Sequence, residues 1–242
     1  MMYNFKKLKS IFDKISYSNS EFTSFSDILD YSLIAFRFYE TNEELKAAHS
    51  ILTLNPKATL YNEFLIELTD LNPEGFADPL GEFYMEHISH GRLGQYFTPE
   101  PISEMMSLLT GEYETGQKIL DPACGSGRFI LSAAKRNRHL LFYAADLDPI
   151  CCKMTLLNML LNSLTGEVAN LNSLSNEFFK GYKVETRLVN GFHYPYFKEF
   201  TDPEQSYICL QPQPMKRQAL TVQDQLKPAE RKQQVFHQGS LF

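Results

Sequence analysis

The chain has 242 residues, of which 43% are hydrophobic and 21% charged, and this composition is that of a globular protein with one or two domains. No apolar run is long enough to cross a bilayer, which argues against a membrane-spanning protein. The net charge of −6 argues against a protein that binds duplex DNA unaided, because neutralisation of phosphates by basic side chains supplies most of that affinity.

The first residues lack the apolar stretch and the cleavage site of a signal peptide, so we expect a cytoplasmic protein. The four cysteines form no C-x-x-C pair and have no histidine at ligand spacing beside them, so we expect no metal site. Thiols stay reduced in the cytosol. We therefore predict that the cysteines are packing residues.

Residues 1–92 are predicted to form a helical domain. Ser24 with Asp27, and Thr41 with Glu44, have the spacing of capping boxes, and apolar residues at helical spacing follow each pair. Two further helices are marked by Leu60, Phe64 and Leu68 and by Leu80, Tyr84 and Ile88. No residue pattern in this stretch points to chemistry, so we interpret it as a helical cap or a layer that docks partners.

Residues 93–214 are predicted to form an α/β domain. Three short apolar strands are expected, with a helix after each of the first two: QKILD (117–121), LLFYAAD (140–146) and EVANL (167–171). The first of these helices is expected from about residue 128 to residue 136. Strands and helices that alternate with short links are typical of a parallel, doubly wound sheet. The predicted fold class is therefore a Rossmann-like α/β core.

The alternation stops beyond Asn172. Three more strands are predicted, and the short links between them imply antiparallel pairing: YKVETRLV, PYFKEF and SYICL. The second half of the sheet is thus expected to be truncated or remodelled. Residues 215–242 are rich in Gln, Lys and Pro and poor in apolar residues, so we predict a flexible polar tail.

The segment ILDPACGSGRFI (119–130) carries the strongest chemical signal, a glycine turn between the first strand and its helix. Gly125 and Gly127 let the backbone approach a ligand closely, and the helix start offers free N–H groups. Asp121 closes the first strand and Asp146 the second, and carboxylates at strand ends suit ribose hydroxyls. The third glycine of the NAD pattern, the G-x-x-x-x-G-K-[ST] phosphate loop and the G-x-S-x-G hydrolase pattern are all absent from this segment. The pattern favours a nucleoside site over a plain tight turn.

DPACGSGRF resembles the first motif of DNA adenine amino-methyltransferases, whose loop holds S-adenosylmethionine. Upstream, HGRLGQYFTPEPI (90–102) resembles the G-x-[FY]-[FY]-T-P stretch of type I restriction–modification modification subunits, and DPLGEFYMEHI (78–88) resembles the helix that precedes it. Thr98 is predicted to cap a helix whose first residue is Pro99. The resemblance covers about residues 78–175 and implies an S-adenosylmethionine-dependent DNA adenine N6-methyltransferase that depends on partner subunits for DNA specificity.

The resemblance also implies roles for single residues. Thr98 would contact the methionine end of the cofactor, Asp146 the ribose, and Leu147 the adenine ring. Asn172 matches the position near the amino group of that adenine. The loop around the cofactor would consist of Asp121, Ala123, Gly125 and Gly127.

One motif of this family is absent from the sequence. Such methyltransferases carry [DN]-P-P-[FYW], whose first side chain and a prolyl carbonyl accept hydrogen bonds from the target adenine, while the aromatic residue stacks on the flipped base. The nearest catalytic candidate here is Gln211 in LQPQP. Two alternatives therefore stay open: a cofactor-binding or assembly subunit without turnover and, more weakly, a methyltransferase for another substrate.

The sequence ends in QGSLF, which resembles the Q-x-[SD]-L-F peptides that dock bacterial proteins on the replication sliding clamp. In that interpretation Leu241 and Phe242 are apolar anchors and Gln238 orients the peptide. An arbitrary tail would explain the same five residues. The clamp is thus a second predicted partner besides DNA.

Overall fold

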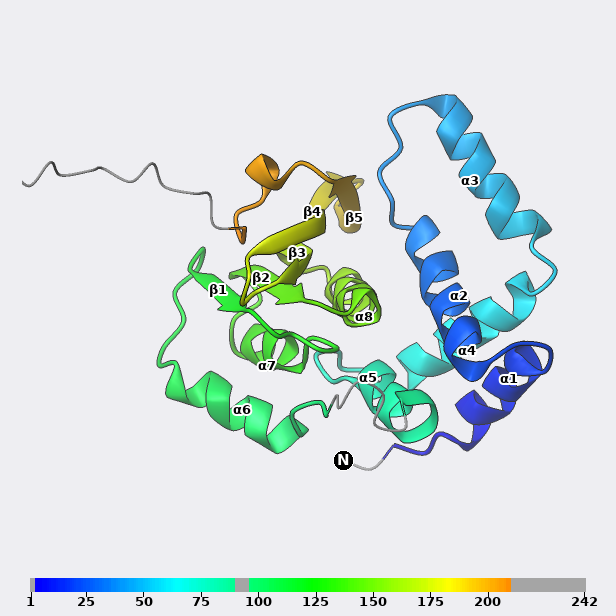
Figure 1. Ribbon diagram of the computed structural model, residues 1–242, viewed down its shortest axis with the longest axis horizontal. Helices are drawn as coiled ribbons and strands as arrows, with labels where there is room; N and C mark the ends of the chain where they lie inside the picture. Colours follow the sequence, from blue (N-terminus) through cyan, green and yellow to red (C-terminus); the bar gives the residue numbers. More distant parts are fainter. Residues whose placement is uncertain (1–2, 90–95, 210–242) are drawn as a thin grey trace, which may run out of the picture. The chain divides into compact units, whose positions relative to one another are not determined.

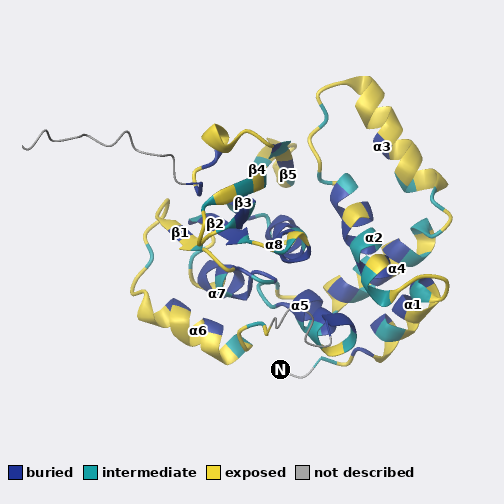
Figure 2. Cartoon of the chain, viewed as in Figure 1, coloured by how far each residue is buried: buried dark blue, intermediate teal, exposed yellow. Residues whose placement is uncertain are grey.

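Four helices open the chain in the computed structural model, which describes residues 3–89 and 96–209 (Figure 1). They are α1 (Lys6–Ser16), α2 (Glu21–Ile34), α3 (Asn42–Leu54) and α4 (Ala58–Asp70). The apolar positions of α1 recur at helical spacing and are buried, and this helix packs against α4. In contrast, α3 is exposed over most of its surface (Figure 2).

Two predicted capping boxes have different outcomes. The one at α3 is confirmed, because the Glu44 amide donates to Thr41 Oγ1 at 3.2 Å and the Thr41 amide donates to the Glu44 carboxylate at 3.3 Å. The one at Ser24 is wrong. Helix α2 begins at Glu21, where the hydroxyl of Ser20 accepts from the Thr23 amide at 3.0 Å. Ser20 lies one turn earlier and is an equally good cap, so Ser24 is buried inside the helix.

The chain then enters α5 (Pro79–Tyr84), a π-helical turn η1 (Met85–Ser89) and α6 (Glu100–Leu109). The helices predicted from Leu60 and from Leu80 are confirmed as α4 and as α5 with η1. Thr98 does not cap α6, which is a correction: Pro99 is the cap residue, and it makes no side-chain hydrogen bond to the helix start. The helix starts one residue later than predicted because Pro99 has an extended backbone, with ψ 144°.

A five-stranded mixed sheet follows, in the order β1-β2-β3-β4-β5. The strands are β1 (Lys118–Asp121), β2 (Leu141–Asp146), β3 (Thr165–Asn172), β4 (Glu177–Val189) and β5 (Phe192–Phe200). The first three are parallel, and α7 (Arg128–Arg136) and α8 (Pro149–Leu161) connect them. The last three are antiparallel. The predicted Rossmann-like core and the antiparallel pairing after Asn172 are confirmed. Among the described strands, β1 stands at one end of the sheet.

The two faces of the sheet are covered differently. On one face, Phe142, Ala144 and Val168 belong to the main core, with apolar residues of α7 and α8. On the other face, Tyr143 and Leu171 belong to a small cluster with Ile208 and Cys209. The helical layer joins the same core, since α2 packs on α8.

The strand predicted over SYICL is wrong for residues 206–209. A short 3-10 helix, η3 (Pro203–Gln205), precedes a turn in which the Ser206 hydroxyl accepts from the amides of Ile208 and Cys209. Buried Glu167 accepts from the Ser206 hydroxyl at 2.5 Å and from the Tyr207 amide at 3.0 Å. Side-chain bonds to the local backbone compete with strand pairing, which is the physical reason for the difference.

The described residues, 3–89 and 96–209, belong to one compact unit. The domain boundary near residue 92 and the flexible tail from residue 215 stay predictions. No helix within residues 3–89 and 96–209 has both the length and the apolar character needed to span a membrane.

Candidate functional site

The glycine turn lies where two parallel strands end side by side. Asp121 ends β1, Asp146 ends β2, and Gly127, with φ 90°, is the cap residue of α7. The Gly125 amide donates to Asp146 Oδ2 at 2.9 Å, so the second carboxylate holds the loop that follows the first strand. Parallel pairing thus brings together residues that are far apart in the sequence.

A cavity of about 370 Å³ opens beside this turn. Of the residues predicted from sequence, the structure brings five to its wall: Thr98, Asp121, Ala123, Gly125 and Asp146. The volume lies within the range of small-molecule sites, about 300–1,000 Å³.

The remaining predicted residues lie outside that wall. Gly127 is buried beside Thr155, and Leu147 is exposed just after β2. The Asn172 side chain accepts from the amides of Leu174 and Ser175. The catalytic candidate Gln211 lies outside the described residues, as do the clamp-binding residues Gln238, Leu241 and Phe242.

Gly125 is required by the packing above the turn. Its φ is 55°, in the left-handed region that side chains rarely adopt, and a Cβ atom there would lie 3.0 Å from the Phe97 ring. Phe97 in turn stacks on Tyr84, with ring centroids 5.8 Å apart. The segment upstream of α6 is therefore in close contact with the turn, although about 25 residues separate them in the chain.

The cavity wall is acidic. Burial raises the pKa of Asp121, and repulsion by Asp146 adds to this rise. Burial likewise raises the pKa of Asp146, while the amides of Asp148 and Gly125 oppose the rise by donating hydrogen bonds. A cation near both groups would favour their ionised form, so the wall suits a positively charged ligand.

Asp78 is the central buried residue beneath the site, and the sequence analysis missed it. As the cap of α5 it accepts from the Gly81 amide at 2.8 Å, and it also accepts from Ser126 Oγ at 2.5 Å and from Asn158 Nδ2 at 2.9 Å. Burial raises the pKa of Asp78, and the Arg128 guanidinium and the Ser126 hydroxyl oppose that rise. Asp78 therefore links α5, the glycine turn and α8.

Arg128 completes this network. Its guanidinium donates to Asp78 Oδ2 at 2.8 Å, to Glu82 Oε2 at 2.5 Å and to the Thr98 carbonyl at 3.2 Å. The carboxylates of Asp78 and Glu82 thus compensate the charge of Arg128. The uncompensated charge on the cavity wall is therefore the negative charge of Asp121 and Asp146. The bond to Thr98 fixes the segment before α6 against the turn.

Gly81 is a second residue that sequence reasoning missed. A Cβ atom at this position would lie 2.2 Å from both the Asp78 carboxylate and the Ser126 hydroxyl. Only glycine lets α5 come this close to the turn. The signal in the sequence was the DPLG string itself, in which an aspartate before proline is a helix cap and glycine is the third helical residue.

The four cysteines are free and buried, which confirms their prediction as packing residues. Thr155 Oγ1 lies 3.3 Å from the Cys124 sulfur and donates to the Gly125 carbonyl at 2.9 Å, so α8 supports the turn from below.

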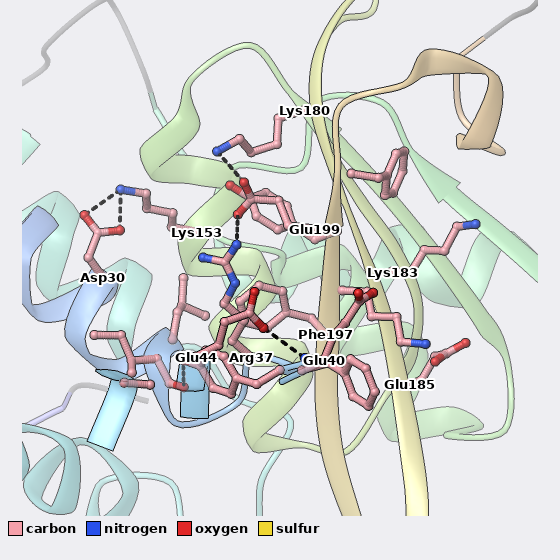
Figure 3. Close-up of a pocket in the computed structure, with 18 of the residues that line it drawn as sticks. Asp30, Arg37, Glu40, Glu44, Lys153, Lys180, Lys183, Glu185, Phe197 and Glu199 are labelled. Carbon is pink, nitrogen blue, oxygen red and sulfur yellow. Dashed lines mark hydrogen bonds and ion pairs between the residues drawn. The ribbon is translucent and has the colours of Figure 1, made fainter. Parts of the chain in front are cut away.

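A larger cavity, of about 950 Å³, lies between α2, α3 and the β4–β5 hairpin (Figure 3). Some of its charged side chains pair with one another: Lys153 with Asp30 at 2.6 Å, and Glu199 with both Lys180 at 2.9 Å and Arg37 at 3.9 Å. None of the predicted site residues that the structure describes lines it. Despite its smaller volume, the glycine-turn cavity is the one lined by residues predicted from the sequence.

Comparison with known proteins finds relatives of the part of the chain that contains the glycine turn. The profile of the N-6 DNA methylase family matches residues 78–213. The type II restriction enzyme and methyltransferase RM.BcgI of Heyndrickxia coagulans is 32% identical over 107 residues, which are 42% of this chain and 17% of that protein. The type I restriction enzyme MpnII methylase subunit of Mycoplasma pneumoniae is 25% identical over 108 residues, 41% of this chain and 20% of that subunit.

Among solved structures, a type I restriction–modification methyltransferase subunit from Streptococcus thermophilus aligns with 69% of this chain and 43% of its own, at 18% identity and a TM-score of 0.35. The matched regions of the two curated relatives, 17% and 20% of their length, show that this chain corresponds to a small part of each.

Proposed function

Because the chain belongs to the N-6 DNA methylase family, we propose that it binds S-adenosylmethionine in the glycine-turn cavity and takes part in methylation of adenine N6 in DNA. The observation that carries this proposal is the meeting of Asp121, Asp146 and the turn at the ends of two parallel strands, inside the region that the family profile matches. Carboxylates at such strand ends accept hydrogen bonds from ribose hydroxyls.

The residues present fit this cofactor in size and in charge. When bound, S-adenosylmethionine supplies a methyl group on a positively charged sulfur. Asp121 and Asp146 favour a cation, and Asp146 keeps acceptor capacity because a carboxylate offers about four lone-pair sites and two amides use it here. Thr98, Ala123 and Gly125 are the further proposed contacts, and Gly127, Leu147 and Asn172 are proposed to support the loop or the adenine end.

Contact with DNA is proposed to depend on partner subunits. A chain with a net charge of −6 provides no overall attraction for phosphates, and two of its relatives are named as methylase subunits of restriction enzymes. The setting is the cytoplasm, where DNA and the methyl donor are both present.

The test has two stages. Isothermal titration with S-adenosylmethionine measures binding, and transfer of labelled methyl groups to DNA, with and without candidate partner subunits, measures turnover. Gly125→Trp is expected to abolish both, because the left-handed backbone and the Phe97 ring leave no room for a side chain. Gly111→Trp is the matched control, since it also has a positive φ but nothing lies within 4 Å of its Cβ position. Absence of binding by the unaltered protein would refute the proposal.

A second candidate, a cofactor-binding subunit without turnover, is favoured by the absence of [DN]-P-P-[FYW] from the whole sequence. It predicts binding at micromolar dissociation constants, about −8 kcal/mol, with no transfer under any condition of the second stage. The two stages therefore separate the candidates.

The sliding clamp is proposed as a further partner on sequence grounds alone. Its test is surface plasmon resonance of the full chain on immobilised clamp, compared with a chain that lacks Leu241 and Phe242. Equal binding of both chains would remove the clamp from the proposal.

A further inference from the structure

The β4–β5 hairpin turns one face away from the core, and this face carries exposed aromatic rings. Phe192, Tyr194 and Tyr196 alternate along β5 and therefore lie on the same face of the sheet. The next residue, Phe197, lies on the opposite face and belongs to the main core. Phe192 and Tyr194 are 69% and 48% exposed. Large solvated rings that lie side by side on a strand mark a surface that binds a partner.

Strand β4 places basic side chains beside these rings. Arg187 lies opposite Tyr194 in the antiparallel register. Further along the hairpin, Lys183 lies opposite Lys198, and residues that are directly opposite share a face of the sheet. Figure 3 shows Lys183 on one side of the two strands and Lys153 on the other. The surface, called the hairpin face below, consists of the three aromatic residues just named with Lys183, Glu185, Arg187 and Lys198.

Lys183 and Lys198 form a pair of like charges within the hairpin face. The Cβ atoms of directly opposite residues are about 4.5–5.5 Å apart, and like charges in such positions destabilise a sheet. Neither ammonium group is in an ion pair within the described residues. Lys183 Nζ lies 5.5 Å from the centroid of the Phe200 ring, and Lys198 Nζ lies 4.5 Å from that of the Phe38 ring. An anionic ligand on this face would relieve the repulsion between the two lysines.

The single carboxylate of the hairpin face is engaged by a neighbour. Glu185 Oε2 accepts from the Tyr196 hydroxyl at 2.6 Å, and this bond also holds the Tyr196 ring in position. Three basic side chains against one carboxylate make this face positive, in a chain whose net charge is −6. A local positive face is what a surface that meets phosphates requires.

Exposed rings on a strand suit unpaired bases. In a duplex the bases stack on one another and offer only their edges in the grooves. In a single strand each base has a free flat side that can stack on an aromatic ring, while basic side chains follow the phosphates. Lysine is depleted in the cores of protein–protein interfaces, so the presence of Lys183 and Lys198 beside the rings favours a nucleic acid over a protein as the partner.

We infer that the hairpin face binds single-stranded nucleic acid. Bases stack on Phe192 and Tyr194, and phosphates lie beside the ammonium groups of Lys183 and Lys198. Stacking tolerates any base, so this face contributes affinity for an unpaired strand rather than sequence recognition. None of its residues lines the glycine-turn cavity, so the inference goes beyond the proposed function and does not depend on cofactor binding.

The experiment titrates the full chain into a fluorescently labelled oligo-dT of about 12 nucleotides and follows the fluorescence anisotropy at several salt concentrations. Tyr194→Ala is expected to weaken binding about 5-fold or more, because one stacked base is lost. The double variant Lys183→Ala/Lys198→Ala should weaken binding and also make the slope of log affinity against log salt shallower, by about 0.7 for each lysine removed.

Two matched controls remove the same residue types elsewhere. Tyr17→Ala removes a ring that is 93% exposed at the end of α1. Lys180→Ala removes a lysine that pairs with Glu199, and Figure 3 shows both on the side of the hairpin that bears Lys153. Each control should change the affinity less than the test variant of the same residue type.

Urea unfolding shows whether the test variants keep their fold. Because Tyr194 is exposed and the two lysines repel each other, the urea midpoint of both test variants should equal that of the unaltered protein. Weaker binding at an unchanged midpoint supports the inference. Failure of the unaltered chain to bind the single strand, tighter binding of the matching dA·dT duplex, or equal losses in controls and test variants would overturn it. The proposed function is tested separately, by titration with S-adenosylmethionine, and none of these outcomes affects it.

Discussion

Replacing Asp78 with alanine is expected to be among the most damaging single changes in the described chain. The change removes one partner of Arg128, whose side chain is only 10% exposed. It leaves Ser126 Oγ without its acceptor and leaves Asn158 Nδ2 with only the Ser126 carbonyl. Breaking a buried ion pair from one side costs about 3–5 kcal/mol, and loss of a helix cap costs about 1 kcal/mol. Glu82 still pairs with Arg128, which favours the lower part of that range.

We therefore expect Asp78→Ala to lower the free energy of unfolding by about 4 kcal/mol. With a urea dependence of about 2 kcal/mol/M, the midpoint should fall by about 2 M. Glu82→Ala is the control on the same guanidinium, and because Glu82 is 47% exposed in its side chain it should cost less than about 1 kcal/mol. The double variant Asp78→Ala/Arg128→Met should recover part of the loss, since it removes the unpaired charge. A single Asp78→Ala variant as stable as Glu82→Ala would refute the reasoning.

Three further predictions concern the same region. Gly81→Ala should destabilise the protein by about 1–3 kcal/mol in urea unfolding, because the alanine Cβ would overlap Asp78 and Ser126. Alanine is the better helix former, so a gain in stability would contradict the close approach of α5 to the turn. Burial raises the pKa of the Asp121 and Asp146 carboxyls above the ordinary 3.8. Between pH 3.8 and these raised pKa values, the folded protein therefore holds protons that the unfolded chain has lost. The free energy of unfolding should fall as pH rises through this window. Over the same window the affinity for S-adenosylmethionine measured by titration should rise, and Asp146→Asn should flatten that rise. Burial raises the pKa of the Cys124 thiol, and all four cysteines are buried. A thiol reagent should therefore react slowly with the native protein and should react with all four thiols after denaturation. Rapid reaction in the native state would be inconsistent with this packing.

The sequence predicts the parallel part of the fold well because each element there has a strong local signal. The helix from Arg128 to Arg136 has the predicted bounds, since a glycine turn begins it and its apolar residues recur at helical spacing. The ends of β1 and β2 follow from short apolar runs that close on aspartates. Parallel pairing then brings the two carboxylates together by geometry alone.

The predictions from sequence are wrong where two or more local conformations of the chain have similar energies. Ser20 and Ser24 are both good caps, and only tertiary burial decides between them. SYICL alternates like a strand, but a buried carboxylate from β3, Glu167, bonds to its first residues and turns it. Such long-range bonds leave no periodic signal in the sequence.

Part of the site could not be predicted for a related reason. Asp78 is unremarkable in the sequence, because its role depends on which atoms surround it. Asp78 is identified by four donors from three segments, which are α5, the glycine turn with the start of α7, and α8. Only a three-dimensional inventory of donors and acceptors identifies residues of this kind.

The position of β1 at the end of the described sheet affects how a large acceptor reaches the site. In doubly wound sheets the ligand crevice lies between two diverging strands, and each strand forms one wall of the crevice. Here the strand that bears Asp121 has a described neighbour only on the β2 side, so the glycine turn stands on the rim of the sheet. In the proposed function, the acceptor therefore reaches the turn at the β1 edge of the described sheet.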